Sequence, residues 1–308
     1  MKTVHVTSLA LALAAAVAFA AAPALAATPI NQSRPLDPRG RVEIENMKGT
    51  IEVRAWDRAE VKIEGMLGEG VEKLEIEGDG RELSISVRYP QSRGLRILGN
   101  RKQAEPTVLK LMVPRRADLD ISAVSADVLA WGVAPSQLSV DNVSGRTTVA
   151  GAADNVDIDS VSGDVEVTVN RANVNIESVS GTIRLSGRLG REVSVESVSG
   201  DVAVNVLDTA IERFEGNSVS GDLDVRTALA PQARVKLETV SGDVQLRLPR
   251  TVSAEIRGES FSGTLRAPGA RIERPEHGPG SNFRQRYGSG SADVSIETFS
   301  GDADVRLE

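Results

Sequence analysis

Apolar residues at every second position recur on both sides of a short Ser-Val-Ser-Gly tetrapeptide through the C-terminal two-thirds of the chain. Around Gly163, Val156 and Ile158 precede the tetrapeptide, and Val165 and Val167 follow it. A period of two is typical of a strand with one buried face. Each unit is therefore predicted to consist of two short strands joined at a sharp bend.

The tetrapeptide recurs at regular intervals. Its glycines are separated by 18, 18, 19, 21, 21 and 21 residues, and then by 38 residues where an insertion interrupts the pattern. One unit cannot bury its apolar face alone, but units stacked about 4.8 Å apart pair every strand with the neighbouring coils. The sequence thus predicts an all-β, single-stranded β-solenoid, similar to a β-helix, of about nine coils. Its corner glycines are Gly145, Gly163, Gly181, Gly200, Gly221, Gly242, Gly263 and Gly301, after a degenerate copy at Ala123–Ala126.

The chain before the repeats is expected to close one end of this stack. Residues 27–39 are predicted to be a flexible linker, and 40–118 an N-terminal β cap region that contains a divergent repeat around Gly49. Terminal repeats are atypical because a solenoid end needs a polar outer face. The solenoid itself is assigned to 119–308, with an insertion loop at 268–290.

Residues 1–26 have the features of a secretory signal peptide. Lys2 precedes an apolar run from Ser8 to Ala22, which is followed by the small residues that signal peptidase recognises. The run is shorter than the ~20 residues of a transmembrane helix, so we expect an exported protein that is not integral to the membrane. The periplasm is the expected location, with the cell surface or the extracellular space as alternatives.

The residues at the corners have a structural and a functional interpretation. Glycine permits the bend, and the neighbouring hydroxyl groups can satisfy backbone groups. The aspartates that follow several corners, such as Asp164 and Asp222, are the alternative, because a column of carboxylates could bind calcium. Thr182 and Arg146 replace the aspartate in other copies, and the chain lacks the nonapeptide of calcium-binding repeats. The structural interpretation is favoured, and no metal site is predicted.

No catalytic motif is found in the sequence. His277 is the one histidine after the predicted signal peptide, and the chain has no cysteine. We therefore predict no catalytic residues and no cofactor. Because carboxylates are abundant, a polysaccharide hydrolase or lyase built on a β-helix remains the enzymatic alternative.

Composition restricts the partners. Aromatic residues make up 3% of the chain, which suits a thin core of stacked strands, and the net charge of −7 argues against nucleic acid. Two basic stretches, 88–102 and 268–290, contrast with this acidity and could bind an anionic glycan or a lipid headgroup; the alternative is that they are solvated loops. The candidate residues are Arg93, Arg96, Arg101, Lys102, Arg271, Arg274, Arg284, Arg286 and Tyr287.

The repeated [Ser/Thr]-[Val/Phe]-Ser-Gly-[Asp/Thr] units between Ser122 and Leu307, with the earlier strand around Gly49, resemble the bacterial β-strand-repeat proteins of the domain of unknown function 4097 family. Its members are often labelled adhesins. The resemblance implies a solenoid-like envelope protein and supplies no catalytic residues. The predicted function is a non-enzymatic, adhesin-like scaffold that binds an envelope glycan, a lipid headgroup or another protein. Assembly through exposed end strands is a further alternative.

Overall fold

The structure is a computed structural model that describes residues 28–90, 104–276 and 279–308. These residues form β-strands and no helix. In chain order the strands are β1 (Thr28–Pro35), β2 (Arg41–Trp56), β3 (Glu60–Leu67), β4 (Lys73–Gly78), β5 (Glu82–Arg88), β6 (Thr107–Pro114), β7 (Asp118–Val133), β8 (Gln137–Ser144), β9 (Thr147–Gly151), β10 (Asn155–Ser162), β11 (Val165–Ser180), β12 (Ile183–Ser199), β13 (Val202–Ser218), β14 (Leu223–Thr239), β15 (Val244–Leu248), β16 (Ala254–Ser260), β17 (Leu265–Arg266), β18 (Ser281–Tyr287), β19 (Ala292–Thr298) and β20 (Ala303–Leu307).

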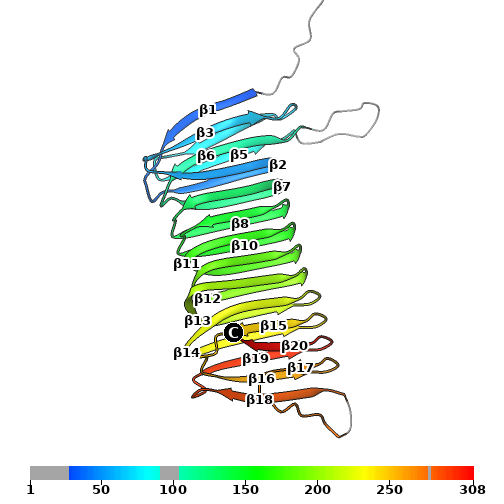
Figure 1. The fold of residues 1–308 in the computed structure, drawn as a ribbon. Helices are drawn as coiled ribbons and strands as arrows, with labels where there is room; N and C mark the ends of the chain where they lie inside the picture. Colours follow the sequence, from blue (N-terminus) through cyan, green and yellow to red (C-terminus); the bar gives the residue numbers. More distant parts are fainter. Residues whose placement is uncertain (1–27, 91–103, 277–278) are drawn as a thin grey trace, which may run out of the picture.

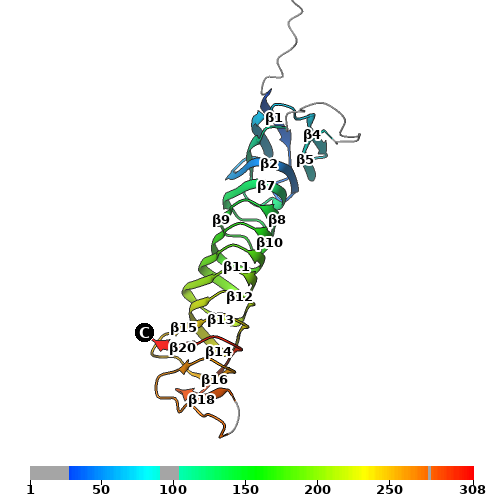
Figure 2. The same cartoon turned by 90° about the vertical axis from the view of Figure 1, so that its right-hand side faces the viewer.

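The repeats form a stack of parallel strands (Figure 1). In β8, β10 and β11, Val140, Ile158 and Ile176 pair with one another from coil to coil. On the other side of the corner, Val149, Val167 and Leu185 pair in the same way. Turned by 90°, the coils follow one another in a narrow column (Figure 2). The all-β, solenoid-like architecture predicted from the repeats is therefore confirmed.

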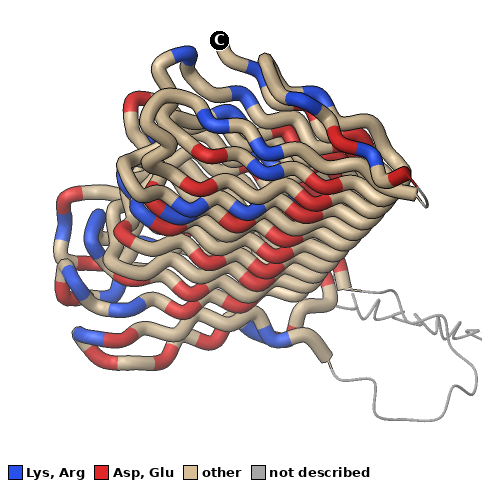
Figure 3. Tube along the Cα trace, turned by 90° about the horizontal axis from the view of Figure 1, so that it is seen from below, with Lys and Arg blue, Asp and Glu red and all other residues tan. Residues whose placement is uncertain are grey.

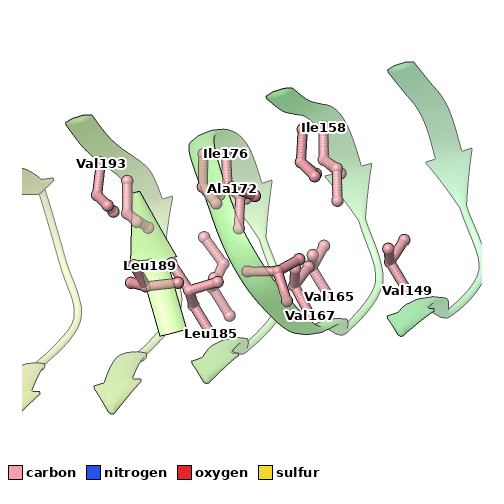
Figure 4. Packing of buried hydrophobic residues seen from close by; sticks show 14 of the residues in the cluster. Val149, Ile158, Val165, Val167, Ala172, Ile176, Leu185, Leu189 and Val193 are labelled. Atoms are coloured by element: carbon pink, nitrogen blue, oxygen red, sulfur yellow. The ribbon is translucent and has the colours of Figure 1, made fainter. Parts of the chain in front are cut away.

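The core is a thin layer between the two rows of strands. Buried side chains from the two rows face one another, as Ile176 and Val193 do toward Leu185 and Val167 (Figure 4). These β-branched and leucine side chains fill the narrow interior without large rings. The buried aromatic side chains of the described residues are Phe214 and Phe283, which explains the low aromatic content.

The corner glycines are required because neighbouring coils approach closely there. A Cβ atom added at Gly200 would overlap the carbonyl oxygen of Gly181, and one at Gly221 would overlap that of Gly200. The same conflict recurs along the column of corners. Only some of these glycines have a positive φ, as Gly181 does (120°), so close packing of backbones explains the whole set better than the bend alone.

The order of the last coils in space differs from their order in the sequence. β14 pairs with β19 and β15 pairs with β20, while β16 and β17 pair with the far sides of β19 and β20. The final repeat is thus inserted between the coil of Gly242 and the coil of Gly263. Within 268–290, which was predicted to be an insertion loop, β18 pairs with β16 in antiparallel orientation and ends the stack.

Antiparallel pairing also marks the N-terminal end. β1 pairs with β3, β3 with β6, and β4 with β5, whereas β2 pairs in parallel with β7. In β2, Gly49 lies opposite Ala126, so the divergent repeat predicted around Gly49 stacks on the first degenerate corner. Both ends of the stack therefore differ from its parallel middle.

Candidate functional site

The second residue of each corner tetrapeptide, the valine of Ser-Val-Ser-Gly, points outward and is exposed. This residue follows the inward–outward alternation of its strand but is apolar on the outward phase: Ile158 and Ser160 are buried, and Val161 is 48% exposed. The residues on either side of it pair from coil to coil, as Ser160 with Ser178 and Ser162 with Ser180, and this register aligns the equivalent residues in one line of large hydrophobic side chains, which we call the apolar column. Its members, in spatial order and each between 42% and 55% exposed, are Met47, Val124, Val143, Val161, Val179, Val198, Val219, Val240, Phe299 and Phe261.

The apolar column ends in two stacked rings. Phe299 and Phe261 have centroids 4.7 Å apart and planes inclined by 4°. Because the last repeat is inserted before the coil of Gly263, Phe299 lies between Val240 and Phe261; in chain order Phe261 would have followed Val240. The exchange of coils thus decides which of the two phenylalanines lies next to Val240.

A second line of outward-facing residues runs beside the apolar column. Each of its positions is two residues earlier in the sequence than a member of the apolar column, and we call it the acidic column. Strand register places Asp141, Asp159, Glu177 and Glu196 next to one another on four successive coils. Seen from below, acidic residues of successive coils follow one another in a band (Figure 3). The positions of the column, in spatial order, are Glu45, Ser122, Asp141, Asp159, Glu177, Glu196, Asn217, Glu238, Glu297 and Glu259.

A groove of about 1500 Å³ runs along the stack between these two columns. The residues between the columns, such as Ser178 and Ser197, are buried and point into the corner, where their hydroxyl groups donate to the carbonyl oxygens of Ser180 and Gly200. One wall of the groove is therefore charged and the other is apolar.

Tyr89 and Arg88 line the N-terminal end of the groove. The single proton of the Tyr89 hydroxyl is shared between two acceptors, Asn46 Oδ1 at 2.9 Å and the carbonyl oxygen of Lys48 at 3.0 Å. Partial burial raises the pKa of Tyr89. Arg88 donates to Glu75 at 2.7 Å and also lies 3.6 Å from Glu45, the first carboxylate of the acidic column.

The middle of the acidic column has no compensating cations from the part of the chain that the structure describes. Among the described residues, Asp141, Asp159, Glu177 and Glu196 form no salt bridge, while Glu238 pairs with Lys236. Burial, and then the neighbouring carboxylates of Asp159 and Asp120, raise the pKa of Asp141. Like charges at this spacing repel one another, so a cation bound there would relieve an existing repulsion.

The aspartates after the corner glycines bind backbone groups. Oδ1 of Asp222 accepts the backbone N–H of Asp243 at 2.8 Å, and Asp222 itself donates its N–H to Asp201 Oδ1 at 3.1 Å. Asp243 accepts the N–H of Asp302 in the same way. These contacts join successive coils and give the aspartates a structural role. No group of three potential metal ligands lies together within the described ranges.

The predicted anion-binding residues are distributed unevenly. Arg93, Arg96, Arg101 and Lys102 lie outside the described residues, as does His277. Arg271 and Arg274 are exposed near the C-terminal end of the stack. Their proposed ligand is not tested by these positions.

The remaining basic candidates belong to β18 and have partners within the chain. Arg284 Nε donates to Glu255 Oε1 at 2.8 Å, and Arg286 lies 3.1 Å from Glu255 Oε2. Arg284 first and then Arg286 hold the pKa of Glu255 below its usual value. The Tyr287 hydroxyl donates to the carbonyl oxygen of Pro268 at 2.7 Å. These side chains join the end strand to β16 and to the segment before it.

The groove was not predicted from the sequence, although a signal for it was present. In Ile158-Asp159-Ser160-Val161, the inward phase passes through Ile158 and Ser160, so the tetrapeptide valine falls on the outward phase. The same argument places the preceding acid outward. Repetition at every corner turns these two outward positions into columns.

The parallel coils, the glycine corners and the two outward columns define an all-β, solenoid-like repeat protein. The profile of the Toastrack DUF4097 family matches residues 40–306, and the chain belongs to this family. No curated protein matches it. Within the described ranges there is no helix with the length and hydrophobicity needed to cross a bilayer.

Three solved structures are similar at low identity. A putative cell adhesion protein from Clostridium sporogenes is 13% identical, with coverage of 91% of this chain and 100% of that chain and a TM-score of 0.25. A putative adhesin from Bacteroides fragilis is 11% identical, with 91% and 97% coverage and a TM-score of 0.38. A putative lipid binding protein from Parabacteroides distasonis is 15% identical, with 90% and 97% coverage and a TM-score of 0.35. These values are too low to bear on function.

Proposed function

We propose that the protein is a non-enzymatic, adhesin-like scaffold of the cell envelope that binds a partner along the groove between its acidic and apolar columns. The apolar column carries this proposal. A monomer rarely exposes a contiguous line of large hydrophobic side chains unless they contact another molecule. Here ten such residues are each about half exposed on a surface held by strand pairing.

The arrangement of the carboxylates supports binding over hydrolysis. Glycosidases place their two carboxyl groups on opposite sides of the scissile bond. In this groove Asp159, Glu177 and Glu196 share one wall, and Val161, Val179 and Val198 form the other. The acids of the groove thus have no acid facing them across it, which favours a surface for recognition.

The proposal also includes the location of the protein, the boundaries of its segments and a second binding site. We place the protein in the periplasm after removal of residues 1–26, with 40–118 as a cap on a solenoid of about nine coils. The basic residues in 93–102 and 271–287 are retained as a second, anionic-partner site, although Arg284 and Arg286 would have to exchange Glu255 for the ligand. Self-association through the end strands is the remaining alternative for the ends of the stack.

The test compares binding of the purified protein to separated envelope fractions: peptidoglycan, lipid vesicles and solubilised envelope proteins. A variant with Val161, Val179 and Val198 changed to Ser should lose the binding that the wild type shows. Leu207→Ser is the matched control, because Leu207 is 47% exposed but lies outside the groove.

Absence of binding, or equal binding by the groove variant and the wild type, would contradict the proposal. A variant lacking 270–288 tests the basic site in the same assay: if its binding to anionic glycans and vesicles is unchanged, that site is wrong. Light scattering on each sample tests self-association, which requires a species larger than a monomer.

A further inference from the structure

We infer that the partner of the groove is an α-helix with a row of basic side chains beside a row of apolar side chains, contributed by another protein or peptide. This inference rests on the proposed function and adds the shape and charge of the ligand. Three observations support it: the unpaired carboxylates, the spacing of the coils and the width of the two-column pattern.

The charge of the ligand follows from the acidic column. Asp141, Asp159, Glu177 and Glu196 stand on successive coils without a salt bridge in the described parts of the chain. Ser122 precedes this run and Asn217 follows it, so these four coils carry an uninterrupted run of carboxylates, and the column becomes acidic again at Glu238, Glu297 and Glu259. Complementary basic side chains would replace the repulsion among these carboxylates with attraction.

The secondary structure of the ligand follows from the spacing. Coils repeat about every 4.8 Å, whereas a helix advances about 5.4 Å per turn and a strand about 6.8 Å between side chains on one face. A helix along the groove therefore drifts by about 0.6 Å per coil and stays in register across four coils. An extended peptide drifts by about 2 Å per coil and loses register within three.

The two-column pattern completes the match. In each of the four coils from Asp141 to Glu196, an acid and an apolar residue lie two positions apart on either side of the groove, as Glu177 and Val179 do. A helix can present two adjacent rows at i, i+3, i+4 and i+7 to such a pair of walls. A charged row then faces the acidic column while the apolar row covers the exposed valines, as in other complexes of a helix in a groove.

The experiment measures binding of fluorescent Leu/Lys peptides of about 14 residues, long enough for roughly four helical turns. One peptide has its leucines and lysines in adjacent helical rows, and a second has the same composition in strict alternation, which favours a strand. A third replaces every lysine of the helical peptide with glutamate. Fluorescence anisotropy at low and high salt gives the affinities for the full purified protein.

The helical lysine peptide should bind at least about tenfold more tightly than either other peptide, and salt should weaken it. Changing Asp159, Glu177 and Glu196 to the corresponding amides should weaken binding at least about tenfold. The matched control changes the exposed acids Asp154, Glu166 and Glu212, which lie outside the groove, and should leave affinity unchanged.

Charge reversal provides a gain of binding that misfolding cannot imitate. Lysines in place of Asp159, Glu177 and Glu196 should make the protein prefer the helical glutamate peptide. Equal or tighter binding of the alternating peptide, or an unchanged affinity of the amide variant, would overturn the inference. The proposed function would survive that result if the serine variant of the apolar column still lost its envelope partner, and would fail if it did not.

Discussion

The two corners of each coil behave differently. The Ser-Val-Ser-Gly corner keeps its register from β8 to β14, with Ser162 opposite Ser180 and Ser180 opposite Ser199. The opposite corner contains the register shifts, for example between Gly187 and Glu192. It also contains the non-glycine residues with positive φ, among them Arg171 at 65°. Variation in repeat length is therefore absorbed at one corner, and the other corner aligns the columns.

This difference shows why the groove is continuous. The acidic and apolar columns require every coil to place the same two outward residues at the same height and position. Close packing of the corner glycines enforces this placement, since there is no space for a side chain between neighbouring backbones. The opposite corner has such closely packed glycines in only some coils, as at Gly187 and Gly190, and no exposed column of this length among the described residues.

The largest expected effect is on the glycine corner. Gly181→Val should destabilise the protein by more than about 4 kcal/mol, because the new side chain would overlap the carbonyl of Gly163 at a φ of 120°. Arg171→Gly, at the opposite corner, should change stability by less than about 1 kcal/mol. Urea denaturation of both variants measures the contrast, and similar losses at the two corners would contradict it.

The next largest effect is expected between an inward-facing and an outward-facing position of one strand, where substitutions should differ in their cost in stability. Ile176→Ala should cost about 2–4 kcal/mol because its side chain is fully buried between Ile158 and Val195. Val179→Ala, three residues later, should stay within about 0.5 kcal/mol because Val179 is 49% exposed. A large loss at Val179 in the same denaturation assay would mean that the apolar column is structural.

The aspartates beside the corners are expected to have a smaller effect. Asp222→Ala should lower stability by about 1 kcal/mol, since it removes the acceptor of the Asp243 N–H. Asp222→Asn keeps an oxygen acceptor and should be closer to the wild type. Thermal unfolding with and without calcium checks the role: stabilisation of the wild type by calcium, lost in both variants, would support a metal site instead.

The smallest effect on stability is expected for Asp141→Asn, and this effect should depend on pH. The raised pKa of Asp141 means that the folded state binds more protons than the unfolded state between the usual aspartate pKa and the raised value. Stability from this group is therefore present at low pH and lost as pH rises through that window. Asp141→Asn should stabilise the protein at neutral pH by about 0.3 kcal/mol after solvent screening. The difference should vanish at low pH; a difference that is the same at neutral and low pH would contradict this account.

Much of the fold could be predicted because every repeat contains the complete sequence pattern of one coil. Alternation around Gly163 or Gly200 identifies the two strands and the corner, and equal spacing identifies the stack. The site was harder to predict, because Val161 and its equivalents look like core residues unless their phase is followed across the corner. The basic segment 281–287 was predicted to be part of a loop that binds an anionic partner. Its residues Arg284 and Arg286 instead pair with Glu255, which lies elsewhere in the sequence.

The order of the last coils was beyond sequence reasoning for a physical reason. The coils of Gly263 and Gly301 carry nearly the same corner, Ser-Phe-Ser-Gly and Thr-Phe-Ser-Gly, so either could follow the coil of Gly242. Their placement is decided by long-range pairing: β18 covers β16 in antiparallel orientation, and Phe283 packs against Gly258. That contact leaves the other side of β16 for β19.

The central claim is that the apolar column continues without a break through the exchanged coils of Gly301 and Gly263. Pairs of cysteines introduced into the column test this claim most directly. The chain has no native cysteine, and neighbouring coils about 4.8 Å apart suit a disulfide. Under mild oxidation, cysteines at 240 and 299 should join, as should those at 161 and 179, whereas cysteines at 240 and 261, two coils apart, should not. Efficient joining of 240 to 261 without joining of 240 to 299 would contradict both the order of the coils and the column built on it.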